Sequence, residues 1–293
     1  MQSQLSYIAS LHEKGGPQPH DYTMLDSNLS QLSEHLQDKA SWHVAMDILK
    51  QYAPGLVSEE TMQGFMIQKP HGYAGDFEII ERLYNRYTSS DEAYKAWDEY
   101  MHYLPAAKAV CNRKDYFKTL MKDTVRHHDT VNVLNVASGP ARDLYEFLIE
   151  NPTYDIQVDC VDQDKNAIDF ASKRCELFSE RVHFHQANAL KFKTDKKYDL
   201  VWSAGLFDYF DDTVFVKALY QLMVQVKPGG ELVIGNFADG NPSKPYMEVV
   251  SWHLHHRSAV KLRKLALEAR VNPDNITFGI EPEGVNLFLH IRK

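Results

Sequence analysis

Hydrophobic residues in the first 130 positions recur at the three- and four-residue spacing of amphipathic helices, with few β-branched runs. The pattern predicts six helices, over residues 24–38, 41–52, 58–67, 76–88, 91–103 and 107–127. Ser89 and Glu92 have the spacing of a capping box at the start of the fifth helix. The glycines and prolines of residues 15–19 predict a loose tether after a short N-terminal segment.

Near residue 130 the pattern changes to short apolar runs that alternate with helical stretches. Strand followed by helix, repeated along the chain, indicates a parallel sheet with helices on both faces. Helices are expected at about 141–150, 165–178, 212–226 and 244–270. The strands are expected over residues 131–137, 156–161, 182–186, 198–203 and 231–237.

Two further predicted strands, 276–280 and 285–291, are separated only by the short turn 281–284. A connection this short joins antiparallel strands. The predicted fold is therefore α/β, an open parallel sheet that ends in an antiparallel hairpin, preceded by an all-helical part. We expect two domains, residues 1–130 and residues 131–293.

The charge balance limits the classes of partner. The chain has 32 Lys and Arg against 40 Asp and Glu residues, a net charge of −8. Such a protein is a poor nonspecific binder of nucleic acid and has no bulk attraction to an anionic membrane. No apolar run reaches the roughly 20 residues of a membrane span, and the N-terminus lacks the pattern of a signal peptide. We therefore expect a cytoplasmic protein with no membrane span, a small-molecule partner and no nucleic-acid partner; its oligomeric state stays open.

The sequence lacks the cysteine and histidine motifs of common metal sites and disulfide frameworks. Cys111, Cys160 and Cys175 are odd in number and include no C-x-x-C pair. His253 and His256 lie three residues apart in the predicted helix 244–270 and would share one of its faces, but no H-E-x-x-H motif contains them. We therefore expect no metal site.

The loop after the first predicted strand has small residues at Ala137, Gly139 and Ala141. This is the spacing G-x-G-x-G with two glycines replaced by alanine. Small side chains let a ligand approach the backbone closely, and the N-terminus of the following helix presents N–H groups. The longer G-x-G-x-x-G spacing of dinucleotide-binding loops is absent, so the loop favours a ligand without a pyrophosphate.

Small or polar residues also follow the next three predicted strands. Asp162 ends the second strand, where an acidic side chain can accept both hydroxyls of a ribose; alternatively it caps the helix that begins near Lys165. Asn188 follows the third strand, where it could hold an adenine amino group, and Ser203 and Gly205 lie at the end of the fourth. The carboxyl ends of neighbouring parallel strands line one ligand-binding crevice.

With these features, residues 131–293 resemble the class I S-adenosylmethionine-dependent methyltransferases. The resemblance implies a seven-stranded Rossmann-like sheet and S-adenosylmethionine as the cofactor. The change of pattern near residue 130 then makes residues 1–130 a helical cap beside this domain. It assigns the glycine-rich loop to 137–141, the ribose-binding acid to Asp162 and the adenine contact to Asn188. The cofactor-binding residues expected on this basis are Tyr73, Ala137, Ser138, Gly139, Arg142, Asp162, Gln163, Asn188, Ala189, Ser203 and Gly205.

Segment 69–76, between two predicted helices, gathers His71, Tyr73 and Asp76 on a backbone with two glycines and a proline. Asp76 is expected to cap the following helix. The permissive backbone favours a lid over the crevice. Tyr73 would close over the methionine end of the cofactor.

Residues in the C-terminal half supply candidates for the acceptor side. Asp208 and Tyr209 follow the fourth predicted strand, and Asn236 lies at the end of the fifth. Arg257, in the predicted helix 244–270, is either a ligand for a carboxylate or a solvated side chain. The candidate catalytic residues are His71, Tyr73, Asp208, Tyr209, Asn236 and Arg257.

Segments 69–76, 137–143, 205–209 and 235–237, together with Trp252, Leu254 and Arg257, resemble a narrower group. This group comprises bacterial methyltransferases that make 3-hydroxypalmitic acid methyl ester. The hypothesis is O-methylation of a carboxyl or hydroxyl group: a carboxylate needs only orientation, whereas a hydroxyl needs a base. The alternatives are a small-molecule N-methyltransferase and a noncatalytic module that binds the cofactor.

Overall fold

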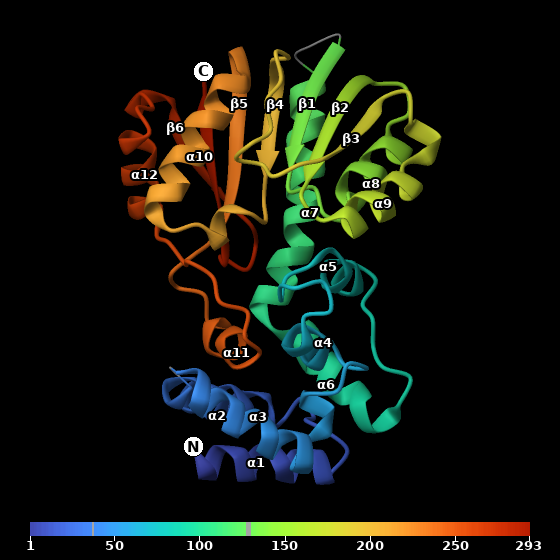
Figure 1. Ribbon diagram of the computed structural model, residues 1–293, viewed down its shortest axis with the longest axis vertical. Coiled ribbons are helices and arrows are strands. Elements are labelled where there is room, and N and C mark those ends of the chain that lie inside the picture. The colour runs from blue at the N-terminus through green and yellow to red at the C-terminus, as the bar shows by residue number, and fades with distance from the viewer. Residues whose placement is uncertain (37, 127–129) are drawn as a thin grey trace. The chain divides into compact units, whose positions relative to one another are not determined.

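The computed structural model describes residues 1–36, 38–126 and 130–293 (Figure 1). Two positions of the predicted helices, 37 and 127, lie outside the described residues. The chain divides into two compact units. The helical unit contains Met1–Lys108 and Pro242–His253, and the sheet unit contains Ala109–Asn241 and Leu254–Lys293. This division by contacts differs from the boundary near residue 130 because most of helix α7 (Pro105–Val125) groups with the sheet.

The helical unit is built from short amphipathic helices. Its buried side chains recur at helical spacing, as Leu25, Leu29 and Leu32 do on α2, where none is more than 1% exposed. Burial of each such side chain contributes about 1.5–3 kcal/mol to stability. The helices are α1 (Gln2–Glu13), α2 (Tyr22–His35), α3 (Lys39–Tyr52), α4 (Met62–Gln68), α5 (Phe77–Tyr84), α6 (Glu92–Tyr103) and α11 (Lys244–Val249).

The N-terminal segment differs from the prediction. It forms the helix α1, which buries Leu5, Ile8 and Leu11. The stretch 15–19 is not a loose tether, because Gly16 is buried and a Cβ atom there would lie only 2.9 Å from the Cβ of Ala96. Close packing against α6 therefore fixes this turn.

Carboxylates cap the helices on either side of segment 85–91. Asp76 caps α5 as predicted, and its side chain accepts hydrogen bonds from the amides of Glu78 and Ile79, both at 2.9 Å. The capping box predicted at Ser89 is wrong, since Asp91 caps α6. An N-cap carboxylate satisfies amides that have no partner within the helix.

The sheet unit contains the seven predicted strands. Their order across the sheet is β3-β2-β1-β4-β5-β7-β6. Strands β1 to β5 are parallel, whereas β7 is antiparallel to both β5 and β6, which confirms the open parallel sheet with a final antiparallel hairpin. The chain order reverses between β1 and β4, and open α/β sheets bind ligands at the carboxyl ends of strands at such a point. The strands are β1 (Thr130–Val136), β2 (Asp155–Asp162), β3 (Val182–Gln186), β4 (Tyr198–Ser203), β5 (Val226–Phe237), β6 (Ile276–Ile280) and β7 (Asn286–Arg292).

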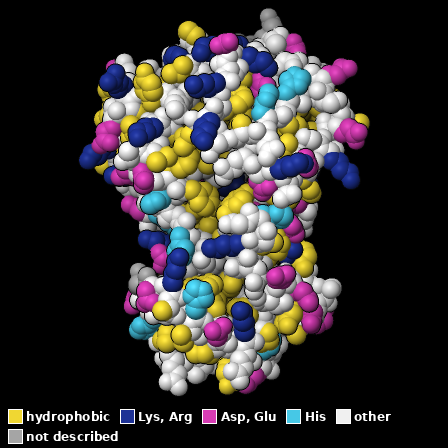
Figure 2. All heavy atoms as spheres, in the orientation of Figure 1, with side chains coloured by type: hydrophobic (Ala, Val, Ile, Leu, Met, Phe, Trp, Pro, Cys, Tyr) yellow, Lys and Arg dark blue, Asp and Glu magenta, His cyan; other side chains and the backbone are white. Residues whose placement is uncertain are grey.

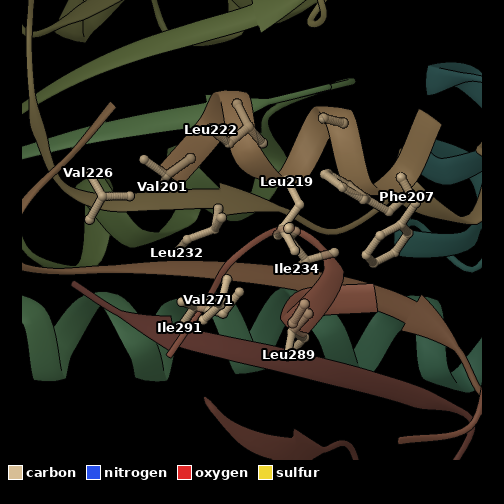
Figure 3. Packing of buried hydrophobic residues seen from close by; sticks show 14 of the residues in the cluster. Val201, Phe207, Leu219, Leu222, Val226, Leu232, Ile234, Val271, Leu289 and Ile291 are labelled. Atoms are coloured by element: carbon tan, nitrogen blue, oxygen red, sulfur yellow. The ribbon is translucent and has the colours of Figure 1, made fainter. Parts of the chain in front are cut away.

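Helices cover both faces of this sheet (Figure 1). The helices α7, α8 (Arg142–Glu150) and α9 (Lys165–Arg174) pack on one face, and α10 (Asp212–Gln225) and α12 (Ala259–Glu268) pack on the other. Figure 3 shows Leu219 and Leu222 of α10 facing Val201, Leu232 and Ile234 of β4 and β5. This packing holds α10 against β4 and β5.

The predicted helix 244–270 is two helices, α11 and α12, with a non-helical stretch between them. Tertiary hydrogen bonds replace helical ones there: the amide of Arg257 donates to the carbonyl of Phe237 at 2.9 Å. Ser258 then caps α12. The expectation that His253 and His256 share a helix face is therefore wrong.

The surface carries charges of both signs. Figure 2 shows Lys and Arg side chains interspersed with Asp and Glu side chains and with uncharged ones. No helix in the described ranges is long and apolar enough to cross a lipid bilayer.

Candidate functional site

The loop after β1 has an unusual backbone. Ala137, Gly139 and Ala141 have φ angles of 54°, 52° and 47°, so both alanines adopt the left-handed conformation that glycine favours. That conformation costs a non-glycine residue about 1–2 kcal/mol, and such strain is concentrated at functional sites. A Cβ atom at Gly139 would have no neighbour within 4 Å, so the loop borders open space.

The carboxylate of Asp162 holds this loop. One oxygen accepts a hydrogen bond from the amide of Gly139 at 2.9 Å, and the other accepts from the amide of Asp164 at 3.0 Å. Asp164 caps α9, so the alternative that Asp162 is the cap is wrong. Burial raises the pKa of Asp162, and these two backbone bonds oppose that shift. Each carboxylate oxygen can accept a second hydrogen bond, so Asp162 can hold the loop and a ribose hydroxyl together.

The third strand end is more exposed than the second. Asn188, directly beyond β3, is exposed, and its Nδ2 donates to the Oε1 of Gln163 at 3.3 Å. This bond links the residues that follow β2 and β3, and the contacts of both side chains with a nucleoside stay a prediction. Ala189 lies half-buried beside Asn188.

Several buried polar atoms near the carboxyl ends of β1 and β4 have no hydrogen-bond partner among the residues that the structure describes. These are the Oγ atoms of Ser138 and Ser203 and the Nδ2 of Asn135. Buried polar groups are normally paired, so these atoms fit a site that receives a polar ligand. Gly205, two residues beyond Ser203, adds no side chain of its own at this position. The described residues contain no cluster of His, Cys, Asp or Glu suited to a metal ion.

Asp208 lies beyond β4 and is only 2% exposed. Its Oδ1 accepts from the amide of Phe237 at 2.6 Å, and its carbonyl accepts from the amide of His255 at 2.7 Å. Burial raises the pKa of Asp208 to about 7, while the Phe237 amide and the charges of Arg113 and Arg257 oppose that rise. Asp208 therefore exchanges a proton near neutral pH.

Arg257 is 3% exposed, so the alternative of a solvated side chain is wrong. Its guanidinium donates to the carbonyl of Phe207 at 3.2 Å, to that of Phe210, and to the Oδ1 of Asn236 at 3.0 Å. It also forms an ion pair with Asp212 at 3.2 Å. These bonds and the ion pair satisfy the guanidinium, which joins the segment beyond β4 to the end of β5. Binding of a ligand's carboxylate by Arg257 stays a prediction.

Asn236 and Tyr209 differ in exposure. Asn236 is fully buried, and its Nδ2 donates to the carbonyl of His255 at 3.0 Å, so it positions the backbone of this stretch. Tyr209 is 37% exposed and belongs to the short 3-10 helix Phe207–Tyr209. Among the four sheet-unit candidates for the acceptor side, the structure joins Asp208, Asn236 and Arg257 in one network.

The other two candidates, His71 and Tyr73, belong to the helical unit. The Nε2 of His71 lies 3.1 Å from the Oε2 of Glu78, and its ring packs against Phe77 at a centroid distance of 4.7 Å. Tyr73 is half-buried. The lid role of this segment stays a prediction.

The structure adds one cationic residue that the sequence did not single out. Arg113 of α7 donates from Nη1 to the carbonyl of Ala204, just beyond β4, at 3.2 Å. Burial raises the pKa values of Asp143 and Asp208, and the charge of Arg113 opposes that rise. Arg142, which was expected to contact the cofactor, begins α8 and lies 3.6 Å from Glu146. Nothing in the sequence pattern of α7 separates Arg113 from its charged neighbours.

Comparisons with known proteins agree with this fold. Residues 133–230 match the model of a methyltransferase domain. A possible exported protein from Bordetella parapertussis has the same fold with a TM-score of 0.66 and 19% identity, over 100% of this chain and 96% of its own. A putative O-methyltransferase from Nostoc punctiforme gives a TM-score of 0.53 and 12% identity, over 83% of this chain and 74% of its own.

A magnesium protoporphyrin IX methyltransferase from Synechocystis, solved with bound S-adenosylhomocysteine, gives a TM-score of 0.50 and 11% identity. That match covers 64% of this chain and 87% of that enzyme. None of the curated proteins matches the chain. The domain match and the fold together confirm the expected methyltransferase domain.

The titration of Asp208 predicts a dependence of stability on pH. The folded state binds this proton more tightly than the unfolded state, whose pKa is near 3.8, so the stabilisation is lost as pH rises toward 7. Between pH 5 and 7.5, the unfolding free energy of the wild type should fall by about 2 kcal/mol relative to Asp208→Asn. Denaturant titrations of both proteins across this range measure the difference, and parallel pH profiles would contradict the buried, titrating carboxyl.

The bonds of Arg257 predict a structural penalty for its removal. Arg257→Met leaves buried carbonyls unpaired and should lower the unfolding free energy by about 3 kcal/mol. Arg263→Met is the matched control, since Arg263 is exposed and has one backbone bond, to the carbonyl of Pro273 at 3.1 Å. We expect the control to change stability by about 0.5 kcal/mol or less in denaturant unfolding. Equal losses in the two variants would show that Arg257 has no special role in the fold.

Proposed function

We propose that this chain transfers a methyl group from S-adenosylmethionine to an oxygen of a carboxyl or hydroxyl group on a small molecule. The observation that carries the proposal is the left-handed loop at Ala137, Gly139 and Ala141, closed by the carboxylate of Asp162. This construction suits close approach of a nucleoside without a pyrophosphate.

The cofactor is S-adenosylmethionine, which supplies an activated methyl group on a sulfonium ion. Because the methyl group is already activated, the protein contributes mainly binding and orientation. Asp162 would hold the ribose, Asn188 with Gln163 the adenine, and the loop 137–141 the middle of the cofactor. The buried hydroxyls of Ser138 and Ser203 supply partners for its polar groups.

The acceptor side could serve either kind of oxygen acceptor. The pKa of Asp208, raised to about 7 by burial, is suited to removal of a proton from a hydroxyl group near neutral pH. A carboxylate acceptor would need no base and would be oriented by groups such as Arg257, Tyr209 or, in the helical unit, His71 and Tyr73. Contacts of His71 and Tyr73 with the acceptor are thus part of the proposal.

The preference for an ester product rests on the resemblance of segments 69–76, 137–143, 205–209 and 235–237 to the 3-hydroxypalmitic acid methyl ester synthases. The net charge of −8 favours a small molecule over a nucleic acid. The cytoplasmic location inferred from the sequence also stays a proposal. N-methylation of a small natural product is the alternative.

The test is transfer of radiolabelled methyl groups from S-adenosylmethionine to 3-hydroxypalmitic acid and to panels of carboxylic acids, alcohols and amines. A methyl ester is hydrolysed by mild base and releases volatile labelled methanol, whereas a methyl ether or an N-methyl amine does not. We expect label in a carboxylic acid product that base releases. Label in a base-stable neutral ether would assign the hydroxyl form of the proposal.

Two outcomes would contradict the proposal. Label retained after base treatment on a cationic product would identify an N-methyltransferase. Tight binding of S-adenosylhomocysteine without turnover on any member of the panels would favour a noncatalytic cofactor-binding module.

A further inference from the structure

A pocket of about 310 Å³ lies in the sheet unit, between the C-terminal half of α10 and the stretch that follows α12. Its apolar lining comes from Tyr220, Met223 and Val224 of α10 and from Ala269 and Val271 beyond α12. Tyr220 and Val224 are 51% and 49% exposed, so their apolar surface is open to a ligand. The volume lies at the lower end of the range for small-molecule sites.

This pocket is separate from the candidate cofactor site. Arg292, which lines the pocket, lies opposite Glu231 in the first half of β5, whereas Asn286 lies opposite Phe237 at the end of that strand. From Glu231 to Phe237 the strand advances about 20 Å. Figure 1 shows the C-terminus at this end of the sheet. The pocket therefore lies toward the amino ends of the parallel strands, and the candidate site lies at their carboxyl ends.

Two arginines give the pocket a positive rim. Arg270 and Arg292 are exposed, and in the described part of the chain neither guanidinium has a hydrogen bond or an ion pair. None of the described side chains that line the pocket is acidic. Lys293 also lines it, but its Nζ donates to the carbonyls of Met223 and Val226 at 3.0 and 2.9 Å. The unpaired charges of the two arginines therefore favour an anion.

Arg270 occupies a position that favours glycine. It follows the last turn of α12 with a φ angle of 66°, in the left-handed region. Its amide donates to the carbonyl of Leu267 at 2.9 Å, and the amide of Val271 donates to that of Ala266 at 3.1 Å, as in the common helix end formed by glycine. Arginine in this conformation costs stability relative to glycine. Since its guanidinium has no bond among the described residues to offset that cost, the helix end does not account for an arginine here.

We propose that this pocket binds an amphipathic carboxylate. Its head group pairs with Arg270 and Arg292, because the planar fork of a guanidinium can donate two parallel hydrogen bonds to a carboxylate. Its apolar chain packs against Tyr220, Met223 and Val224, and burial of this surface adds favourable free energy. The inference is independent of the proposed methyl transfer.

Calorimetry with decanoate and decyltrimethylammonium, below the concentrations at which they form micelles, tests the preference for an anion. The two probes have the same apolar chain and opposite charges. The wild type should bind decanoate at least about tenfold more tightly, since two guanidiniums attract the carboxylate and repel the ammonium group. Equal affinities would overturn the proposal, because they would show apolar contact without recognition of charge.

Arg270→Gly separates binding from stability. Glycine relieves the left-handed backbone, so the midpoint of thermal unfolding should rise by about 1–4 °C. The affinity for decanoate should fall by about three- to fivefold, because one exposed charge contact is lost. A fall in the midpoint would show that the guanidinium serves the fold and would contradict the proposal.

Arg86→Gly is the matched control for this variant. Arg86 has a φ angle of 51° just beyond α5, and its amide likewise donates to a carbonyl three residues earlier, that of Leu83, at 3.1 Å. Arg86→Gly should therefore raise the unfolding midpoint to a similar extent and leave the affinity for decanoate unchanged. An equal loss of affinity in Arg86→Gly and Arg270→Gly would overturn the role of Arg270.

Val224→Glu places a carboxylate in the pocket and should weaken decanoate binding by about tenfold or more. Val260→Glu is its control, since Val260 is 80% exposed on α12 and is not among the residues that line the pocket. Decanoate binding that neither Arg270→Gly nor Val224→Glu weakens would place the ligand elsewhere, such as at the proposed acceptor site, and would overturn the inference. A dimer that Val224→Glu dissociates, in a wild type that does not bind decanoate, would assign the pocket to a second copy of the chain instead.

Discussion

The hydrogen bond from the amide of Gly139 to the carboxylate of Asp162 is the interaction on which the candidate site depends. It connects the end of β2 to the loop beyond β1 and holds a backbone in which Ala137 and Ala141 are strained. The amides of Ala137 and Ser138 also donate to the carbonyl of Val161, at 2.8 and 3.3 Å, so three bonds join the loop to the end of β2. One carboxylate thus shapes the loop and remains able to bind a ribose.

A second network orders the backbone beyond β4 and β5. Arg257 joins the backbone beyond β4 to Asn236 at the end of β5, and the amide of Phe237 binds Asp208. Burial of polar groups costs free energy unless each forms hydrogen bonds, and most of these groups bond to one another. The same enclosure raises the pKa of Asp208, so the network sets a chemical property as well as a shape.

The sequence was sufficient for the sheet and for the residues at strand ends, because strand periodicity and turn residues are local signals. The sequence was insufficient where hydrogen bonds between distant segments determine the backbone conformation. The stretch before Ser258 has a helical pattern of apolar residues, yet the amide of Arg257 bonds to β5. Arg257 itself was expected to meet a ligand or solvent, and only the packed structure shows its acceptors. The sequence pattern does not distinguish Arg113 from other charged helix residues, and only the fold shows its bond to the carbonyl of Ala204.

The most direct test of the cofactor site is calorimetric titration of S-adenosylhomocysteine into the wild type, Asp162→Ala and Asp155→Ala. Asp155 begins the same strand at its opposite end and accepts a hydrogen bond from the hydroxyl of Thr130 at 2.6 Å, so it controls for loss of a carboxylate on β2. The account predicts a loss of affinity of about tenfold or more for Asp162→Ala and no change for Asp155→Ala. Unchanged affinity in Asp162→Ala would contradict it.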